Sequence, residues 1–398
     1  MRVYVDLLRY GAARRLTAAT ATGKLGFAVF PLATVLLGHG SSGSFLDAGA
    51  VAGAWGMGGT VTGPLRGRLV DRYGQRLPLV ALTLITALAA AGLATAAGTT
   101  QLICFGALTG AAAPPIVASI RPLWAQAAPK DLVHSAYALD AVLTEVTKIC
   151  GPLVAAASAV HSPRLGVITA AALLTASTCL VISHPPTRRP PAASRTGGVP
   201  ASPALRLLLA ANACAGLFLG ALTVGLPARA AESGSVADSG WLFACLALGS
   251  ALVGARFGTR RRAASPATGY LTTFAWLALS LALLAAVSTP LPLVILLLST
   301  GAALAPMTIC LFELLDVHAS QHTAVASMMW MVAGEELGVA AGSVVAGLLA
   351  QNVGAWLALL AAAASAGLGA LVVATGRVAL ASDSTATDHG CPVSNDRG

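Results

Sequence analysis

Long apolar runs, each about as long as a membrane-spanning helix, alternate with short polar connections along most of the chain. A helix needs about 20 predominantly apolar residues to cross the hydrocarbon core of a bilayer. The runs that meet this length cover residues 16–38, 44–65, 78–97, 101–124, 134–159, 163–183, 205–229, 239–257, 267–288, 291–314, 322–350 and 353–376. The pattern therefore predicts an all-α integral membrane protein with twelve transmembrane helices.

A polar stretch at residues 184–204 interrupts this pattern after the sixth span. Its sequence, HPPTRRPPAASRTGGVPASPA, is rich in Pro, Arg and Ser, a composition typical of linkers. We interpret it as a cytoplasmic linker that joins an N-terminal six-helix bundle, residues 1–183, to a C-terminal six-helix bundle, residues 205–377. The polar segment 378–398 is predicted to be a disordered cytoplasmic tail.

Composition narrows the class of protein further. Of the 398 residues, 56% are hydrophobic and only 10% are charged, whereas soluble globular proteins carry about 25% charged residues. This balance argues against a soluble enzyme, a disordered protein and a secreted disulfide scaffold. Six of the seven cysteines lie in apolar runs and no two form a CxxC pair, so we expect neither a metal site nor a disulfide framework.

The distribution of basic residues predicts the orientation in the membrane. The net charge is +9, and basic residues collect on the cytoplasmic side of membrane proteins. If both termini are cytoplasmic, 19 of the 24 Lys and Arg residues fall in cytoplasmic segments. Only Arg164 and Arg229 fall in extracellular segments, and the others lie within the predicted spans. We therefore expect a multi-pass protein of the cell membrane with cytoplasmic termini, and the positive charge needs no nucleic-acid partner to explain it.

An internal repeat is found when the chain is compared with itself at an offset of 191 residues. Glycine, proline and glutamate recur at matching positions, because Gly58, Gly63, Gly67, Gly110, Pro115, Glu145 and Gly151 match Gly249, Gly254, Gly258, Gly301, Pro306, Glu336 and Gly342. Two similar six-span halves around a central site are a layout of transporters that rock to expose the site to each side in turn. The repeat thus predicts a central cavity and alternating access.

The connection between the second and third predicted spans carries a motif of glycine and charged residues. In GRLVDRYGQR, residues 67–76, the order is Gly, three residues, Asp, basic, any, Gly, any, basic, and it is filled by Gly67, Asp71, Arg72, Gly74 and Arg76. Together with the twelve spans and the repeat, this motif resembles the signature of the major facilitator superfamily, and the chain is most similar to its drug exporters.

The resemblance implies that this loop latches the cytoplasmic side in the outward-open state. Asp71 is expected at the start of the eleventh span, where the positive end of the helix dipole stabilises a carboxylate. Arg72 and Arg76 would pair with acids or lipid phosphates, Gly67 would permit close helix approach, and Gly74 a tight turn. The alternative is a solvated basic loop that only sets the topology.

Markers of the superfamily's exporters are only partly present. Gly151 and Pro152 in the fifth span resemble the exporters' Gly-Pro motif, although Thr147 replaces the usual upstream glycine. An arginine early in the fourth span, which the resemblance links to proton coupling in drug antiporters, is absent. We expect Gly151 and Pro152, like Pro115 and Pro306 in the fourth and tenth spans, to bend their helices.

Ionisable residues inside the predicted spans each need a partner or a function, because a charge in hydrocarbon costs about 2.5–3.5 kcal/mol even on insertion scales. They are Lys24, Asp140, Glu145, Lys148, Glu313, Glu335 and Glu336. Glu145 and Lys148 share a helical face, and Lys24 reaches Glu145 if the first and fifth spans pack together. Two interpretations stay open: Glu145 is a proton site or substrate anchor, or an ion pair ties the helices together.

Further polar and aromatic residues are candidates for the cavity. Glu336, the repeat mate of Glu145, is expected to face it, while Glu335 points about 100° away. Asn212 in the seventh span is a candidate hydrogen-bonding group. Trp55 and Trp330 either line the path or anchor the protein at the membrane interface.

These features predict a secondary active transporter that moves a small, fairly apolar organic molecule by alternating access. The cavity would lie between the first, fourth, fifth, seventh, eighth, tenth and eleventh spans. We expect export, with proton coupling through Glu145 or Glu336 as a hypothesis. The expected partners are the small-molecule substrate, protons and the lipid membrane; we expect a monomer without cofactor or metal.

Three alternatives remain. The same fold would also serve an importer of a polar metabolite such as a sugar, although few Asn, Gln and aromatic residues occur in the relevant spans. A substrate-sensing membrane receptor is the second alternative. A membrane enzyme is the third, and the sequence disfavours it, because the seven histidines are scattered and form no HExxH motif.

Overall fold

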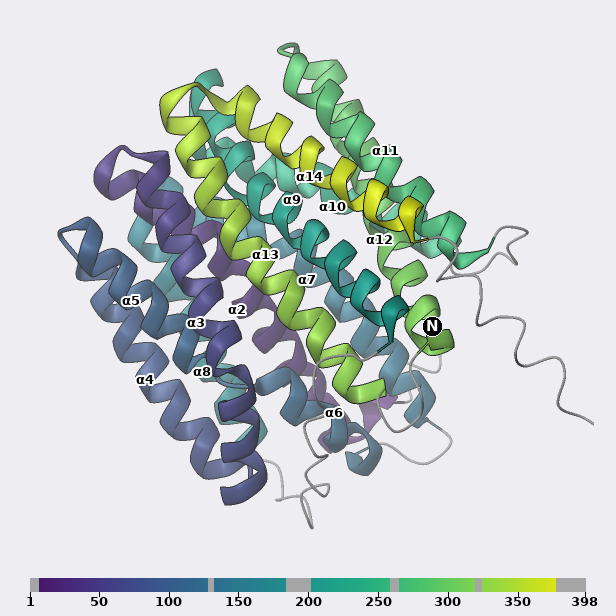
Figure 1. Cartoon of the computed structure of the whole chain (residues 1–398). Helices are drawn as coiled ribbons and strands as arrows, with labels where there is room; N and C mark the ends of the chain where they lie inside the picture. Colours follow the sequence, from purple (N-terminus) through teal and green to yellow (C-terminus); the bar gives the residue numbers. More distant parts are fainter. Residues whose placement is uncertain (1–6, 128–131, 184–201, 258–264, 319–323, 377–398) are drawn as a thin grey trace, which may run out of the picture.

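The fold is built entirely from helices in the part of the chain that the structure describes. A computed structural model describes residues 7–127, 132–183, 202–257, 265–318 and 324–376. The helices are α2 (Gly11–Ser42), α3 (Phe45–Tyr73), α4 (Arg76–Thr95), α5 (Thr99–Ala112), α6 (Ile116–Ala127), α7 (Val133–His161), α8 (Pro163–Ile182), α9 (Pro203–Ser233), the 3₁₀ turn η1 (Val236–Asp238), α10 (Ser239–Phe257), α11 (Pro266–Ala286), α12 (Pro290–His318), α13 (Ala324–Asn352) and α14 (Ala355–Thr375). Figure 1 shows α4 and α5 at one edge of this bundle and α11 and α14 at the opposite edge.

Membrane spans account for most of these helices. Within the described ranges, 10 helices are long and apolar enough to cross a membrane. The others are α3, which is rich in glycine, and the pair α5 and α6, which have only 14 and 12 residues. Counted as one interrupted span, α5 and α6 bring the helix order into agreement with the expected twelve. The predicted linker and tail lie almost wholly outside the described residues.

A proline pair breaks the predicted fourth span, which we expected to be one helix over 101–124. α5 ends at Ala112 and α6 begins at Ile116, with Pro114 and Pro115 between them. Proline lacks the N–H that continues a helix and pushes the preceding residue out of the helical region. Pro115 therefore separates two helices, whereas Pro152 and Pro306 lie inside the continuous helices α7 and α12.

The predicted second span is also longer than expected. We placed its end at residue 65, yet α3 continues to Tyr73, so that most of the GRLVDRYGQR motif is helical and not a loop. Gly74 follows with φ 76°, a left-handed conformation that glycine adopts without steric cost. The tight turn expected at Gly74 is therefore found, and α4 begins at Arg76.

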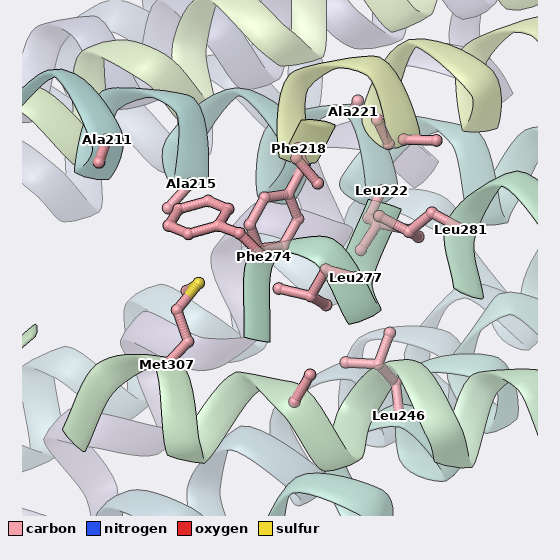
Figure 2. Packing of buried hydrophobic residues seen from close by; sticks show 14 of the residues in the cluster. Ala211, Ala215, Phe218, Ala221, Leu222, Leu246, Phe274, Leu277, Leu281 and Met307 are labelled. Carbon is pink, nitrogen blue, oxygen red and sulfur yellow. The ribbon is translucent and has the colours of Figure 1, made fainter. Parts of the chain in front are cut away.

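Each half of the chain has its own buried cluster of apolar side chains. One draws mainly on α2 and α4–α8, the other mainly on α9–α14. Figure 2 shows part of the second cluster, in which Phe218 of α9, Phe274 and Leu277 of α11 and Met307 of α12 turn toward one another. The apolar faces of six helices are thus buried within each half.

Backbone-to-backbone contacts at glycines repeat between the two halves. A Cβ at Gly58 would overlap the carbonyl oxygen of Ala107, and a Cβ at Gly249 would overlap that of Leu298. The contact partners Ala107 and Leu298 are separated by the same 191 residues as Gly58 and Gly249. The glycines bring α3 against α5 and α10 against α12, which is the use that membrane helices make of small residues.

These contacts yield a prediction about stability. We expect Gly58→Ala and Gly249→Ala each to lower the free energy of unfolding by about 1–3 kcal/mol, because the added methyl group meets backbone that cannot turn away. Thermal unfolding of the purified protein in detergent measures the loss. Gly98→Ala is the matched control, since a Cβ there meets no atom within 4 Å among the described residues; equal effects at all three positions would contradict the prediction.

Candidate binding cavity

A cavity of about 570 Å³ lies between the two halves. Its walls come from α2, α3, the end of α5 and α13, through Phe27, Trp55, Gly56, Gly59, Thr60, Gly63, Pro64, Arg66, Arg68, Gly110, Ala113, Met328, Trp330, Val332, Ala333 and Glu336. This size falls within the range of about 300–1,000 Å³ that is typical of small-molecule sites.

Close packing of α3 against α13 closes one end of this cavity. We name the two ends of the bundle after the residues that join helices there: the Gly43 end, between α2 and α3, and the Gly74 end, between α3 and α4. A Cβ at Gly49 would overlap the carbonyl oxygen of Ser343, and the Phe45 N–H donates to Gln351 Oε1 at 2.8 Å. The halves therefore touch through backbone at the Gly43 end, as Figure 1 shows for α3 and α13.

The cavity extends from this contact toward the Gly74 end. Arg68, which is exposed, and Met328, which is 38% exposed, lie at that end of its lining. The second contact between the halves is made by α7 and α10, where a Cβ at Gly240 would overlap the side chain of Ala156. These two contacts between the halves thus rest on small residues.

Aromatic rings form much of the apolar wall. Phe27 comes from α2, Trp55 from α3 and Trp330 from α13. The ring of Phe30, which is fully buried, stacks on Trp55 with centroids 5.7 Å apart and an interplanar angle of 15°. This stacking fixes the Trp55 ring, so that the wall is largely preformed.

Arg66 brings a positive charge back from the Gly74 end into the cavity. Its guanidinium donates hydrogen bonds to the carbonyl oxygens of Gly59 and Ala113. The side chain reaches Gly59, seven residues earlier on the same helix, because Gly59 and Gly63 carry no side chains that would occupy this stripe of α3. The Ala113 carbonyl is available because the proline pair ends α5 there.

Glu336 supplies a negative charge from the other half. It lies on α13 level with Gly56, whose Cβ would be 4.0 Å from the Glu336 carbonyl oxygen. Among the described residues its carboxylate has neither a hydrogen bond nor an ion pair, although it interacts electrostatically with Arg66 and Glu335. The cavity therefore holds opposite charges on its two walls, one from each half.

The structure places Lys24 away from this cavity, in a contact between α2 and α7. Its ammonium lies 2.8 Å from Asp140 Oδ1 and donates to the Asp140 carbonyl oxygen at 2.8 Å and to Thr144 Oγ1 at 2.6 Å. Asp140 is therefore the carboxylate that Lys24 binds, whereas the sequence led us to expect Glu145 as its partner. The side chain of Glu145 lies outside the described residues, and Lys148 is exposed on α7 and absent from the cavity lining.

Asn212 makes the equivalent contact in the second half. Its amide donates to the Met331 carbonyl oxygen at 2.9 Å and to Glu335 Oε2 at 3.4 Å, and the side chain is 2% exposed. The offset of 191 carries Asp140 to Met331 and Thr144 to Glu335. A polar residue of the first helix in each half thus binds the same two positions of the fifth, and Asn212 holds α9 to α13 instead of lining the cavity.

We expect the Lys24 contact to contribute to stability. Lys24→Met leaves Asp140 without its cation, and the loss should stay below the roughly 3–5 kcal/mol of a fully buried pair, since Asp140 is 30% exposed. The double variant Lys24→Met/Asp140→Asn should lose less than the single variant. Thermal unfolding in detergent measures both; a double variant that is less stable than the single one would contradict the ion-pair account.

The GRLVDRYGQR motif is only partly visible. The side chain of Asp71 and residues 319–323 lie outside the described residues, so the expected latch near the start of α13 remains a prediction. Within the described residues a Cβ at Gly67 would meet no atom within 4 Å, so the close helix approach expected there is not found. Arg72 is exposed and its guanidinium lies 5.4 Å from the centre of the Tyr73 ring.

The other residues singled out in the sequence either pack helices together or line the cavity. Gly151 packs against Ala28, so that it brings α7 close to α2. Trp55, Trp330 and Glu336 line the cavity. Sequence reasoning missed Arg66, which we counted only as a charge that sets the topology; the glycines seven and three residues before it were the available signal.

Several solved transporter structures are similar to this chain. Among solved structures, the chain is similar to the nucleoside transporter NupG, with 15% sequence identity and a TM-score of 0.74 over 93% of this chain and 99% of that one. It is also similar to the human organic anion transporter MFSD10 (TETRAN), with 17% identity and a TM-score of 0.63 over 91% and 98% of the two chains. A third is an auto-inhibited peptide transporter of the POT family, with 12% identity and a TM-score of 0.66 over 97% and 98%.

These structural likenesses show the fold alone, because the identities are low. No curated protein sequence matches the chain significantly. A family profile described as the Major Facilitator Superfamily matches residues 16–335, which is most of the chain. With two repeated helical halves around a cavity, and with this match, the chain belongs to the major facilitator superfamily.

Proposed function

We propose that the protein is a secondary active transporter that moves a small organic molecule across the cell membrane by alternating access. The observation that carries this proposal is the cavity between the halves, which packing of α3 on α13 closes at the Gly43 end. Rocking of two repeated halves around a fixed site would open that end and close the other.

The chemistry of the walls supports a substrate with a large apolar part. Three aromatic rings and Met328 line the cavity, and methionine adapts to ligands of varied shape. Only three of the lining residues are charged, Arg66, Arg68 and Glu336, which is typical of sites that bind by apolar contact and fix orientation with a small number of polar groups.

We propose export as the direction and a proton as the coupling ion. The distribution of Arg and Lys predicts that the Gly74 end is cytoplasmic, so that the cavity would load from inside the cell. Glu336 is the candidate proton carrier, because its carboxylate makes no hydrogen bond or ion pair among the described residues and can bind either a proton or a substrate. Glu145, its repeat mate, is the second candidate.

Import of a polar metabolite is the second candidate function. The likeness to a nucleoside transporter is the observation that favours it. Export and import differ in the side of the membrane from which the substrate is taken up. Loading from inside the cell with an inward proton gradient favours export, whereas accumulation from outside favours import.

Flux measurements on the full chain test this proposal. The purified protein is reconstituted into proteoliposomes and offered a panel of aromatic, nucleoside and sugar compounds, with and without a pH gradient. Uptake of an aromatic compound against its gradient into acidic vesicles would support proton-coupled export. Absence of flux for every compound in the panel, with protein that is folded and correctly inserted, would overturn it.

A further inference from the structure

The opposite charges of the cavity restrict the substrate class, an inference that rests on the proposed transport function. Arg66 and Glu336 come from different halves, and both line the same cavity. They interact electrostatically, yet no ion pair within 4.0 Å joins them. Space for a ligand group is therefore left between two charges that would otherwise neutralise each other.

We propose that the cavity binds an aromatic molecule with an amphoteric head, which carries an ammonium and a carboxylate at one end. The ammonium would pair with Glu336 and the carboxylate with Arg66, while the aromatic body lies among Phe27, Trp55 and Trp330. Binding in this manner joins α3 to α13 and hence one half to the other.

Electrostatics exclude the simpler substrates. An organic anion at Arg66 faces the negative charge of Glu336, and an organic cation at Glu336 faces the positive charge of Arg66. Charges interact strongly where water is scarce, and repulsion of the wrong partner is an effective source of specificity. A head with both charges satisfies both walls, whereas either singly charged molecule satisfies one and is repelled by the other.

The Arg66 guanidinium is positioned for this role before any ligand arrives. Its hydrogen bonds to the Gly59 and Ala113 carbonyls use two of its five N–H donors. Nε is buried without a partner in the described residues, and the remaining terminal N–H groups are left for a ligand. A carboxylate fits the planar fork of a guanidinium.

The aromatic walls match the rest of such a molecule. Flat rings stack favourably on Trp and Phe, and an ammonium near an aromatic face gains further stabilisation. Trp55 is held in place by Phe30, so that little ordering is required on binding. Arg68 is exposed at the Gly74 end, where salt and water screen its charge.

Three matched probes test the inference on the full-length protein in detergent. Phenylalanine carries both charges, phenethylamine lacks the carboxylate, and 3-phenylpropionate lacks the ammonium. Binding is measured by thermal stabilisation at millimolar concentration. Phenylalanine should bind at least about tenfold more tightly than either of the others, since a hydrogen bond to a charged group is worth that much.

Single substitutions test the contributions of Glu336 and Arg66 to binding one at a time. Glu336→Gln should remove the advantage of phenylalanine over 3-phenylpropionate and keep its advantage over phenethylamine. Arg66→Lys keeps the charge but loses the planar fork, and should weaken phenylalanine and 3-phenylpropionate together. Arg164→Gln is the control, because this positive charge is exposed at the start of α8 and does not line the cavity; it should leave the ranking unchanged.

Several results would overturn the inference. A singly charged probe that binds as tightly as phenylalanine would do so, as would an unchanged ranking in Glu336→Gln. Absence of binding by all three probes would also overturn it, although flux of other compounds would leave the transport proposal standing. The expected ranking without any flux in liposomes would instead overturn transport and keep the binding class.

Discussion

Glu336→Gln should make transport insensitive to the pH gradient. Glutamine keeps the size and hydrogen-bonding capacity of the side chain but neither binds nor releases a proton. If Glu336 holds a proton in one conformation and the substrate ammonium in the other, the two ligands compete for one carboxylate. We expect the stimulation of flux by an inward proton gradient to disappear in this variant.

The measurement uses saturating substrate, so that weaker binding in the variant does not imitate loss of coupling. Substrate exchange without a gradient serves as the second readout and should persist in Glu336→Gln. Asp238→Asn is the control, because this carboxylate is exposed in the turn before α10, away from the cavity. If flux in Glu336→Gln still responds fully to the pH gradient, Glu145 becomes the candidate proton-binding carboxylate. If flux in the double variant Glu145→Gln/Glu336→Gln also responds fully, neither carboxylate couples transport to protons.

The helices and their repeat could be predicted from the sequence because both depend on local composition. Apolar length decides where a helix can cross a bilayer, and the repeated glycines mark contacts that tolerate no side chain, as at Gly58 and Gly249. The repeat also led us to expect Glu336 at the cavity, and its side chain is among the lining residues. These inferences need only the order of residues along the chain.

Partners that lie far apart in the chain could not be predicted in this way. Arg66 reaches the cavity because the carbonyl of Ala113, 47 residues away, is released by a helix break. Lys24 binds Asp140 across 116 residues, and nothing in the sequence distinguishes that carboxylate from Glu145, five residues further along α7. Such choices depend on the rotation of one helix against another, which side-chain packing determines.

Closure of the Gly43 end should depend on Gly49. A Cβ at this position would overlap the backbone oxygen of Ser343 on α13, so a side chain must separate the two helices. We expect Gly49→Val to disfavour the conformation closed at this end by about 1–3 kcal/mol or more, the usual cost of overpacking. Because the cycle passes through this closed conformation, flux should fall by about 5- to 150-fold, the factor that corresponds to 1–3 kcal/mol.

A graded series distinguishes this effect from loss of fold. Gly49→Val should retain less flux than Gly49→Ala, while size-exclusion chromatography shows folded protein for both. Ser343→Gly should not restore flux to Gly49→Val, because the overlap is with a backbone oxygen that the substitution leaves in place. Gly98→Val is the matched control at the same end of the bundle, where a side chain meets open space. Normal flux in Gly49→Val would mean that the halves separate and rejoin without the α3–α13 contact, and the closed end would then be set by the other contacts between the halves, such as that of α7 with α10.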